Sequence, residues 1–423
     1  MKILVLGPGA REHAIITALL ADNGGHEVVC APGNAGIATD VATHPLDAND
    51  PLAVADFASS GNFDLVVIGP EAPLVAGVSD AVRAAGIPVF GPSGAAAALE
   101  GSKAFAKRVM DAAGVPTGRS VRAVTVHQAA EAIDTFGAPY VIKADGLAAG
   151  KGVLVTEDRD AALRHCEQWA GHGGVLIEEF LDGPEVSLFL LSDGEHVLPL
   201  SPAQDYKRLL DGDAGPNTGG MGAYSPLPWL ADAFGSERAF VDEVIETIAL
   251  PTVRELAAQG TPFVGLLYCG LIVTRDGIRV IEFNARFGDP ETQVVLPRLE
   301  TPLAELLYDA ATGSLGDRER PLFSSDVAVT VVLASENYPE TPVTGRVLEG
   351  LADAAAVPGV HITHAATTDA ADGTVRTSGG RVLSVVAVGR DFTDARARVY
   401  DALGRIHLEG GQYRTDVAAR VAH

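Results

Sequence analysis

Two lysines beside a glycine-rich stretch are the first residues of this 423-residue chain whose types and spacing could do chemistry. Lys143 follows the β-forming run 140–142, and Lys151 lies among small residues a few positions later. Glycine amides can approach an anion closely, so this stretch suits a polyphosphate. The glycines are Gly146, Gly150 and Gly152. The first two are separated by three residues where a Walker A motif needs four, which excludes that motif. The alternative interpretation is a hairpin turn with two surface lysines.

A carboxylate, an amide and a guanidinium alternate farther along the chain. The run 277–283 is a predicted strand, and period-two alternation from it places Glu282, Asn284 and Arg286 on one face. Ile281, with Phe283 and Ala285, would lie on the other face. Such polar groups are costly in a core unless magnesium and an anion occupy the space between them. An exposed edge strand with outward polar residues is the alternative.

Residues 1–100 alternate short β-rich runs with alanine-rich helical stretches, which predicts an open parallel sheet flanked by helices. Each run ends in a turn rich in glycine and proline. Ligands bind at the carboxyl ends of such strands, so we expect these turns to meet in one crevice. The runs are Ile3–Leu6, Glu27–Cys30, Leu65–Ile68 and Pro88–Phe90.

The first of these turns resembles a dinucleotide-binding loop only in part. Gly7 and Gly9 fit the pattern, but Glu12 stands where the third glycine belongs. The second strand also ends without the acid that would hold a ribose. A small phosphorylated molecule at the N-terminus of the helix beginning near Arg11 fits better.

The sequence pattern changes after Gly101. Ser102 is a predicted cap for a helix containing Lys103, and the strand-rich unit 121–191 around the glycine stretch is typical of a lid. The Gly- and Pro-rich segment 200–226 is either an ordered binding loop or a long surface loop. An amphipathic helix is predicted over 237–259.

After Pro321 a third region begins, with predicted strands over 327–333 and 382–388 and a helix over 393–406. His361 and His364 are three residues apart without a third ligand nearby, so we expect surface histidines rather than a metal site. No chemistry is evident in this region, and we expect it to close over the site or to pack on the first domain.

Composition narrows the possible partners. With 31 basic and 55 acidic residues, the formal net charge is −24, which disfavours nucleic acid and anionic membranes. Three scattered cysteines favour a reducing compartment without disulfides. No apolar run approaches the ~20 residues of a membrane span, and the N-terminus is unlike a signal peptide. We therefore expect a soluble, cytoplasmic protein.

Four long motifs, in this order, resemble the ATP-grasp ligases and most closely the phosphoribosylamine–glycine ligase family of purine biosynthesis. The resemblance covers essentially the whole chain. It implies a multidomain α/β and α+β fold: an open parallel α/β sheet (1–101), an ATP-grasp domain (102–325) with a mobile lid (about 121–191), and a small mixed α/β C-terminal domain (326–423). The motifs span residues 91–94 with 99–105, 142–152, 215–226 and 281–293.

The resemblance also implies roles for individual residues. Lys143 and Arg286 are the expected catalytic residues, and Glu282 and Asn284 the expected ligands of Mg²⁺ or Mn²⁺. The expected ATP-binding residues are Lys103, Lys143, Gly146, Gly150, Lys151, Gly152, Glu178, Leu181 and Glu185. The expected substrate-binding residues are Gly9, Arg11, Asn34, Glu71, Lys207, Asn217, Thr218, Gly219, Arg286 and Asp289.

The implied reaction joins glycine to 5-phosphoribosylamine through glycyl phosphate and consumes ATP. The protein would act on these small molecules as a monomer. The alternative is another ATP-grasp carboxylate–amine ligase or a carboxylase of the purine or biotin type. Three departures from the family pattern are visible: Pro8 and Ala10 in the first loop, Ala285 where relatives often have Cys, and a strand at 266–271 that carries no acid.

Overall fold

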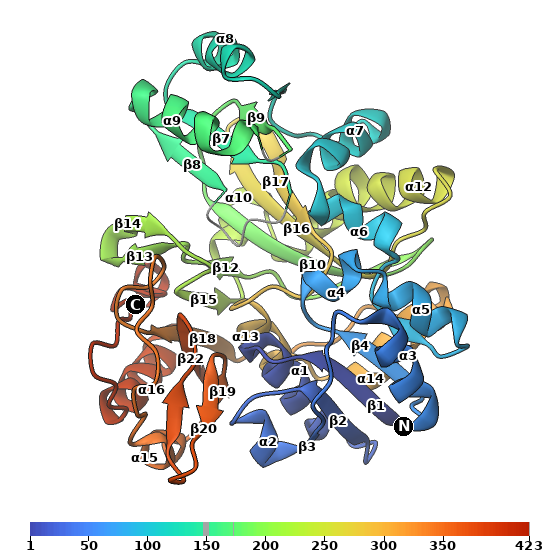
Figure 1. Ribbon diagram of the computed structural model, residues 1–423, viewed down its shortest axis with the longest axis vertical. Coiled ribbons are helices and arrows are strands. Elements are labelled where there is room, and N and C mark those ends of the chain that lie inside the picture. The colour runs from blue at the N-terminus through green and yellow to red at the C-terminus, as the bar shows by residue number, and fades with distance from the viewer. Residues whose placement is uncertain (147–151, 172, 423) are drawn as a thin grey trace.

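The computed structural model describes residues 1–146, 152–171 and 173–422. It has the mixed α/β multidomain architecture expected from the sequence. Figure 1 shows the N-terminal sheet at the lower right, the C-terminal sheet at the lower left and a small α+β unit at the top. A central antiparallel sheet joins these parts.

The N-terminal domain is an open sheet of parallel strands in the order β3-β2-β1-β4-β5, which confirms the prediction. Its central strands are continuous apolar runs, as expected when helices cover both faces of a parallel sheet. The strands are β1 (Lys2–Gly7), β2 (Glu27–Pro32), β3 (Ala42–Thr43), β4 (Leu65–Ile68) and β5 (Val89–Phe90). The flanking helices are α1 (Ala10–Ala21), α2 (Ile37–Asp40), α3 (Pro51–Ser60), α4 (Glu71–Val75), α5 (Val78–Ala84) and α6 (Gly94–Gly101).

The central sheet has the order β11-β10-β16-β17, with antiparallel pairing throughout. The helix predicted over 237–259 is present, with a π-helical turn at Ile245–Ala249 between two α-helical parts. The strands are β10 (Glu185–Asp193), β11 (Val197–Pro199), β16 (Val264–Thr274) and β17 (Gly277–Asn284). Their helices are α7 (Lys103–Ala113), α10 (Trp229–Phe234), α11 (Glu237–Val244), α12 (Leu250–Ala258), α13 (Thr292–Val295) and α14 (Leu303–Thr312).

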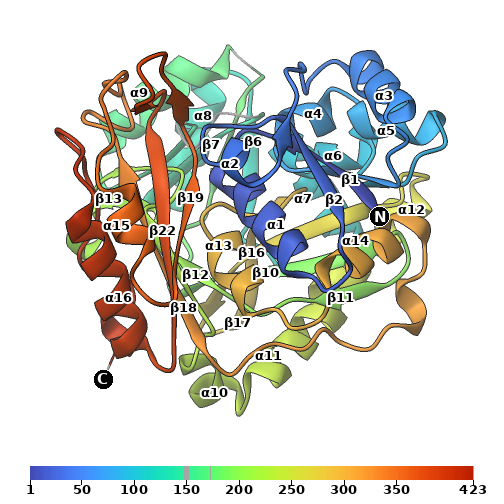
Figure 2. The ribbon, with the colours of Figure 1, turned by 90° about the horizontal axis from the view of Figure 1, so that it is seen from below.

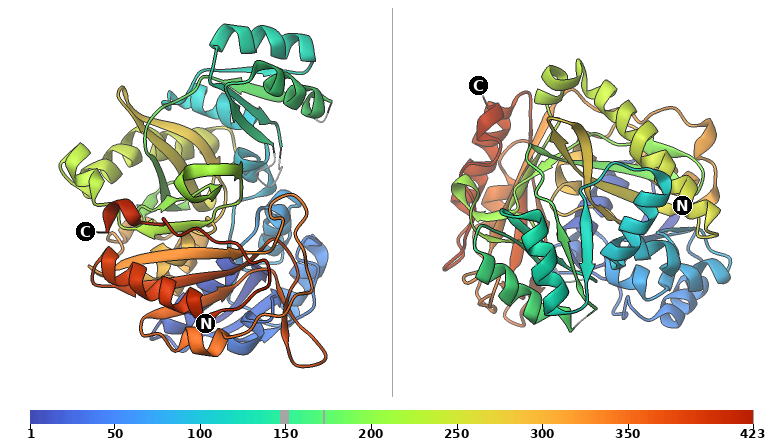
Figure 3. Two further views of the ribbon diagram at one scale, coloured as in Figure 1. Left: turned by 90° about the vertical axis from the view of Figure 1, so that its left-hand side faces the viewer. Right: turned by 90° about the horizontal axis from the view of Figure 1, so that it is seen from above.

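The lid is a four-stranded sheet, β6-β9-β7-β8, with two helices packed on it around a small core of their own. It projects from the rest of the molecule (Figure 3, left). The sequence-based limit of 191 is wrong, because β10 pairs along its whole length with β16 and belongs to the central sheet. A strand pattern is local and does not identify the sheet that a strand joins. The elements are β6 (Ser120–Ala123), α8 (Val126–Phe136), β7 (Tyr140–Ala144), β8 (Val153–Thr156), α9 (Arg159–Ala170) and β9 (Val175–Glu178).

The C-terminal sheet, β12-β15-β18-β22-β19, takes two strands from the segment 200–226. That segment is thus ordered, and it extends the C-terminal sheet although it lies within the predicted range of the ATP-grasp domain. Seen from below, this sheet stands beside the N-terminal domain (Figure 2). Its elements are β12 (Gln204–Asp205), β15 (Gly222–Ser225), β18 (Val327–Ala334), β19 (Val360–His364), β22 (Arg381–Gly389), α15 (Leu351–Ala355) and α16 (Phe392–Arg405). Two short hairpins accompany it: β13 (Arg208–Leu210) with β14 (Ala214–Asn217), and β20 (Thr367–Asp369) with β21 (Val375–Thr377).

The expectation of a surface position is wrong for His364. This residue is buried where the C-terminal sheet meets the first domain, and its backbone N–H donates to His13 Nδ1 at 2.9 Å. Burial, together with the neighbouring His13, lowers the pKa of His364 to about 4. His361, three residues earlier on β19, is exposed as expected. Among the described residues, no helix is long and apolar enough to cross a membrane, and the three cysteines are buried and free.

Candidate active site

Two lysines share one buried carboxylate where the lid meets the central domain. Lys143, on β7, lies with its Nζ 2.8 Å from Glu178 Oε2, and Lys107, on α7, lies 3.2 Å from Glu178 Oε1. Lys143 also donates to the carbonyl of Ile281 at 3.0 Å, which links the lid to β17. Burial raises the pKa of Glu178, but attraction to both lysines outweighs it and holds that pKa below its usual value. Glu178 therefore stays ionised between the two lysines to a lower pH than an ordinary glutamate.

The resemblance placed Glu178 among the ATP-binding residues. The structure adds a task for its side chain, which fixes Lys143. Lys107 was absent from the expected site, although it lies four residues after Lys103 on the same helix and thus on the same face. Leu181 lies in the connection between β9 and β10, next to this cluster in the chain.

Lys103 is a third lysine at this site, and it contacts the first glycine of the glycine-rich stretch. Its Nζ donates to the carbonyl of Gly146 at 3.1 Å, and burial together with repulsion from Lys143 lowers its pKa although Glu282 opposes this. An anion that binds beside such a lysine stabilises its charged form. Gly150 and Lys151, also expected here, lie outside the described residues. Gly152 is described, and its carbonyl accepts from Ala144 N–H at 2.7 Å.

A β-bulge changes the predicted alternation in β17. Gly270 pairs with Glu282 whereas Leu271 pairs with Val280, which leaves Ile281 as the extra residue. Placing Ile281 on the buried face with Phe283 was therefore wrong: Ile281 is only half-buried, and its carbonyl faces Lys143. The bulge shifts the phase of the strand by one residue.

Glu282 and Asn284, the expected metal ligands, lie on this strand. Burial raises the pKa of Glu282, but attraction to Lys207, Lys143 and other cations outweighs it and lowers that pKa. Within the described part of the chain, no side chain donates a hydrogen bond to the Glu282 carboxylate, so its oxygens are free for a cation. Asn284 Oδ1 accepts from Arg286 Nη2 at 3.3 Å.

This donor set fits a metal only in part. Among residues 1–146, 152–171 and 173–422, no group of three or more His, Cys, Asp or Glu side chains could hold an ion. A charged carboxylate without a hydrogen-bond donor and an amide oxygen suit Mg²⁺ when phosphate oxygens and water supply the other ligands. The two residues thus fit a metal that arrives with a polyphosphate.

Arg286 lies between two carboxylates of the first domain. Its Nη2 is 3.0 Å from Glu100 Oε1, and its Nε is 3.5 Å from Glu71 Oε2. Burial lowers the pKa of Arg286, but these two carboxylates outweigh it and raise the pKa. Glu71 was an expected substrate-binding residue, whereas Glu100 was missed although it lies in the 99–105 motif. The structure brings Arg286 to the crevice at the strand ends.

A second mixed-charge group joins the start of β10 to β12. Lys207 forms an ion pair with Glu185, and its Nζ is 3.6 Å from Asp205 Oδ1. Burial and repulsion from Glu291 and Glu185 raise the pKa of Asp205 to about 7, although Lys207 opposes this. Asp205 was not among the expected site residues, and the neighbouring Lys207 is the signal that could have indicated it.

The Gly9 amide in the first loop is already occupied. The N–H of Gly9 donates to Glu12 Oε2 at 2.6 Å, so the Glu12 side chain caps its own helix. Gly7 has a positive φ of 126°, and a Cβ there would lie 2.7 Å from Glu12 Cδ. Arg11 Nη1 donates to Glu12 Oε1 at 3.2 Å and to the carbonyl of Gly69 at 3.0 Å, while its buried Nε has no partner. Arg11 is thus held at the crevice with one donor unused.

Asn34 fixes this loop from the next strand. Its Nδ2 donates to the carbonyls of Pro8 and His364, both at 2.7 Å, and its Oδ1 accepts from Ile37 N–H at 3.0 Å. The side chain therefore connects the first loop to the C-terminal domain.

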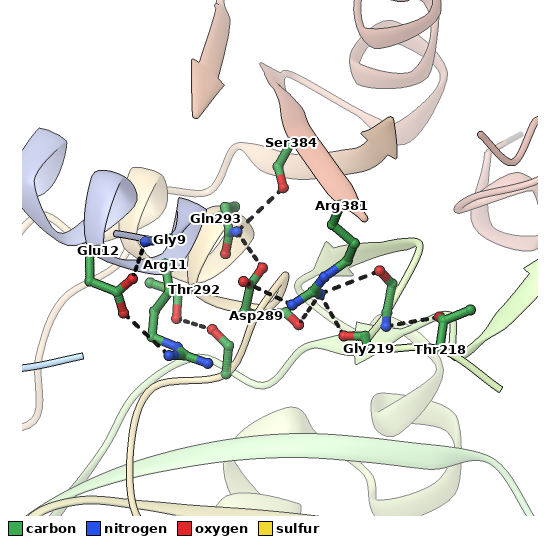
Figure 4. Close-up of polar contacts among 12 residues, drawn as sticks. Gly9, Arg11, Glu12, Thr218, Gly219, Asp289, Thr292, Gln293, Arg381 and Ser384 are labelled. Atoms are coloured by element: carbon green, nitrogen blue, oxygen red, sulfur yellow. Dashed lines mark hydrogen bonds and ion pairs between the residues drawn. The ribbon is translucent and has the colours of Figure 1, made fainter. Parts of the chain in front are cut away.

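Thr218 and Gly219 lie near Asp289, and Arg381 bridges Gly219 and Asp289 (Figure 4). Thr218 Oγ1 donates to the carbonyl of Lys207 at 2.8 Å and accepts from Gly220 N–H at 3.0 Å. Asn217, at the end of β14, pairs with Arg208. Burial raises the pKa of Asp289, but Arg381, Arg11 and Gln293 outweigh it and lower that pKa. Arg381 belongs to the C-terminal domain, where no chemistry was expected.

In this site a small lid domain and charged lysines face β17, a strand that carries a carboxylate and an amide. This arrangement is that of an ATP-grasp protein. The chain belongs to the phosphoribosylglycinamide synthetase family, because it matches that family's N domain over residues 1–100, its ATP-grasp (A) domain over 101–292 and its C domain over 328–420. The resemblance inferred from the sequence is thus confirmed.

Individual proteins agree with this assignment. The chain is 70% identical to the phosphoribosylamine–glycine ligase of Leifsonia xyli over 99% of its own length and 100% of that protein's. It is 58% identical to the enzyme of the same name from Streptomyces coelicolor, with 100% of each chain covered. The crystal structure of phosphoribosylamine–glycine ligase from Thermotoga maritima superimposes with a TM-score of 0.83 at 33% identity, covering 98% of this chain and 100% of that one.

Proposed function

We propose that the protein ligates glycine to 5-phosphoribosylamine in purine biosynthesis, using ATP and releasing glycinamide ribonucleotide, ADP and phosphate. The observation that carries this proposal is the match to three domains of one family in order. A match restricted to the ATP-grasp domain would fit other carboxylate–amine ligases and carboxylases equally well.

In the first step, a glycine carboxylate oxygen attacks the γ-phosphorus of ATP, the bond to the β-phosphate oxygen breaks, and ADP leaves. The approach of two anions requires fixed cations in line with them. Lys143 is held by Glu178 and by the Ile281 carbonyl, which supports its assignment as a catalytic cation. Lys103, with its lowered pKa, gains a partner when phosphate arrives.

The nucleotide's remaining parts would lie along the connection between the lid and the central sheet. Backbone groups near Glu178 and Leu181 are the proposed adenine contacts, and Glu185 is the proposed acceptor for the ribose hydroxyls. Glu185 pairs with Lys207 in this structure, so nucleotide binding would exchange one partner of that carboxylate for another.

Glu282 and Asn284 would hold Mg²⁺ or Mn²⁺ together with phosphate oxygens. The bound ion would screen the phosphates and polarise the γ-phosphoryl group. Gly270 opposite Glu282 supports this placement, since a Cβ there would lie 3.2 Å from Glu282 Cγ and would crowd the carboxylate.

In the second step, the amine nitrogen of phosphoribosylamine attacks the glycyl carbonyl carbon, phosphate leaves, and the nitrogen loses a proton. The acyl phosphate hydrolyses in water, so a closed lid is useful at this stage. Arg11, with an unpartnered buried Nε, and Arg286 are the proposed cations for the anionic substrates. We further propose that the protein acts as a cytoplasmic monomer.

The test is ADP release by the purified protein with ATP and Mg²⁺. We expect turnover only when glycine and phosphoribosylamine, generated in situ from ribose 5-phosphate and ammonia, are both present. Full turnover with bicarbonate or formate in place of glycine would instead indicate the alternative ATP-grasp carboxylase or ligase. Replacing Mg²⁺ by Mn²⁺ in the same assay tests the choice of metal.

A further inference from the structure

Arg381, the first residue of β22, reaches from the C-terminal domain toward Gly219 and Asp289 (Figure 4). Its Nη1 donates to the carbonyls of Gly219 at 2.6 Å and Asp289 at 2.8 Å, and its Nη2 donates to Asp289 Oδ2 at 3.0 Å. These acceptors come from two segments about 70 residues apart in the chain, and Arg381 is far from both. One guanidinium therefore joins three parts of the sequence.

The fork geometry of arginine suits this task. Its planar group presents several donors in fixed directions, so one side chain can bind a carboxylate and backbone carbonyls together. Burial lowers the pKa of Arg381, but attraction to Asp289 outweighs it and raises the pKa. The interaction is thus a charged one that water screens little.

The segment 219–220 packs closely against this guanidinium and against Pro290. A Cβ on Gly219 would lie 3.1 Å from Arg381 Cζ, and a Cβ on Gly220 would lie 2.5 Å from Pro290 Cδ. Gly220 also has a positive φ of 109°, which disfavours other residues. The two segments therefore approach each other closely only with glycines on one side and the arginine between them.

The other oxygen of Asp289 is held as well. Gln293 Nε2 donates to Asp289 Oδ1 at 2.8 Å, so both carboxylate oxygens have a defined direction. A second residue of the C-terminal domain also contributes, since the N–H of Gly219 donates to the Tyr338 hydroxyl at 2.9 Å. The C-terminal domain thus holds both the N–H and the carbonyl of one expected substrate-binding residue.

We propose that Arg381 is a positioning residue for the ligation, and that the C-terminal domain completes the substrate site through it. This inference rests on the proposed function and on the expectation, from the family resemblance, that Gly219 and Asp289 contact the substrates. Arg381 fixes the distance between these two groups and has no role at the ATP site. Its loss should weaken binding of the substrates that are ligated and leave the nucleotide unaffected.

The test compares Arg381→Met and Arg381→Lys with wild type. We expect Arg381→Met to raise KM tenfold or more for glycine or for phosphoribosylamine, while KM for ATP stays within twofold. Arg381→Lys keeps the charge without the planar fork of donors. Its KM for the affected substrate should therefore lie between those of wild type and Arg381→Met. Because Lys is the conservative change, it also serves if the Met variant does not fold.

Arg376→Met is the matched control. Arg376, on β21 of the same domain, donates to a carbonyl (Gly345, 3.0 Å) and to a carboxylate (Asp372, 2.8 Å), but both lie outside the crevice. Its three KM values should match wild type. Unchanged KM values in both Arg381 variants, or a KM for ATP that rises equally, would overturn the positioning role. A wild type inactive with both substrates would instead overturn the proposed function.

Discussion

Replacing Glu178 by Gln removes the only negative charge that directly pairs, within the described chain, with both Lys143 and Lys107. The side chains of all three are at most 10% exposed, so solvent screens their charges little. Removing one partner of a buried ion pair costs about 3–5 kcal/mol. Lys107 keeps two acceptors, Thr117 Oγ1 and the Gly118 carbonyl, and Lys143 keeps the Ile281 carbonyl. We therefore expect the lower end, a loss of about 3 kcal/mol.

The assay is urea unfolding followed by tryptophan fluorescence. The chain has two tryptophans, and one of them, Trp169, lies in the lid on α9. In a Trp229→Phe background, fluorescence reports on the lid alone. Glu179→Gln is the matched control, because Glu179 pairs with a largely exposed Arg119 and such surface pairs contribute only about 0–1 kcal/mol.

The same variant predicts a pH dependence. The pKa of Glu178 is below its unfolded value, so its contribution is fully present above the ordinary pKa of about 4.3 and is lost as pH falls through the folded value. The stability difference between wild type and Glu178→Gln should thus be full at neutral pH and shrink below about pH 4. Equal unfolding of the Glu178 and Glu179 variants at neutral pH would refute this account of the lysine pair.

Three further changes test other parts of the site. Glu282→Gln should reduce ADP release at least a hundredfold without lowering the melting temperature, whereas near-normal turnover would remove Glu282 from the metal site. Asp205→Asn should stabilise the protein more at pH 8 than at pH 5 in thermal unfolding. The folded pKa of Asp205 is raised to about 7, so the native carboxyl costs stability increasingly as pH rises toward that value. A gain in stability that is independent of pH would contradict the raised pKa. Asn34→Ala removes three hydrogen bonds and should cost about 2–3 kcal/mol of unfolding free energy, and an unchanged denaturation midpoint would show that the first loop is held without it.

Much of the fold could be predicted from the sequence because the signals are local. The apolar runs of β1 and β4 and the turns after them predicted the parallel sheet and the crevice at its strand ends. The alternation of polar and apolar residues around Glu282 predicted a polar face on β17. It did not predict the bulge at Ile281, because a bulge depends on the pairing with β16. The end of the lid was missed for the same reason, because β10 has to find its partner strand.

By itself, the sequence determined the order of elements and the family, and it indicated the cations expected at a polyphosphate, since motifs and periodicity lie within short windows. Only the tertiary structure decided how those charges are held. Lys143 and Ile281 are 138 residues apart, and Arg381 and Gly219 are 162 residues apart. No pattern within one segment encodes such pairs, because burial and the meeting of separate strands select them. Lys143, beside the glycine-rich stretch, is held by the carboxylate of Glu178. Only the folded lid brings these two residues together.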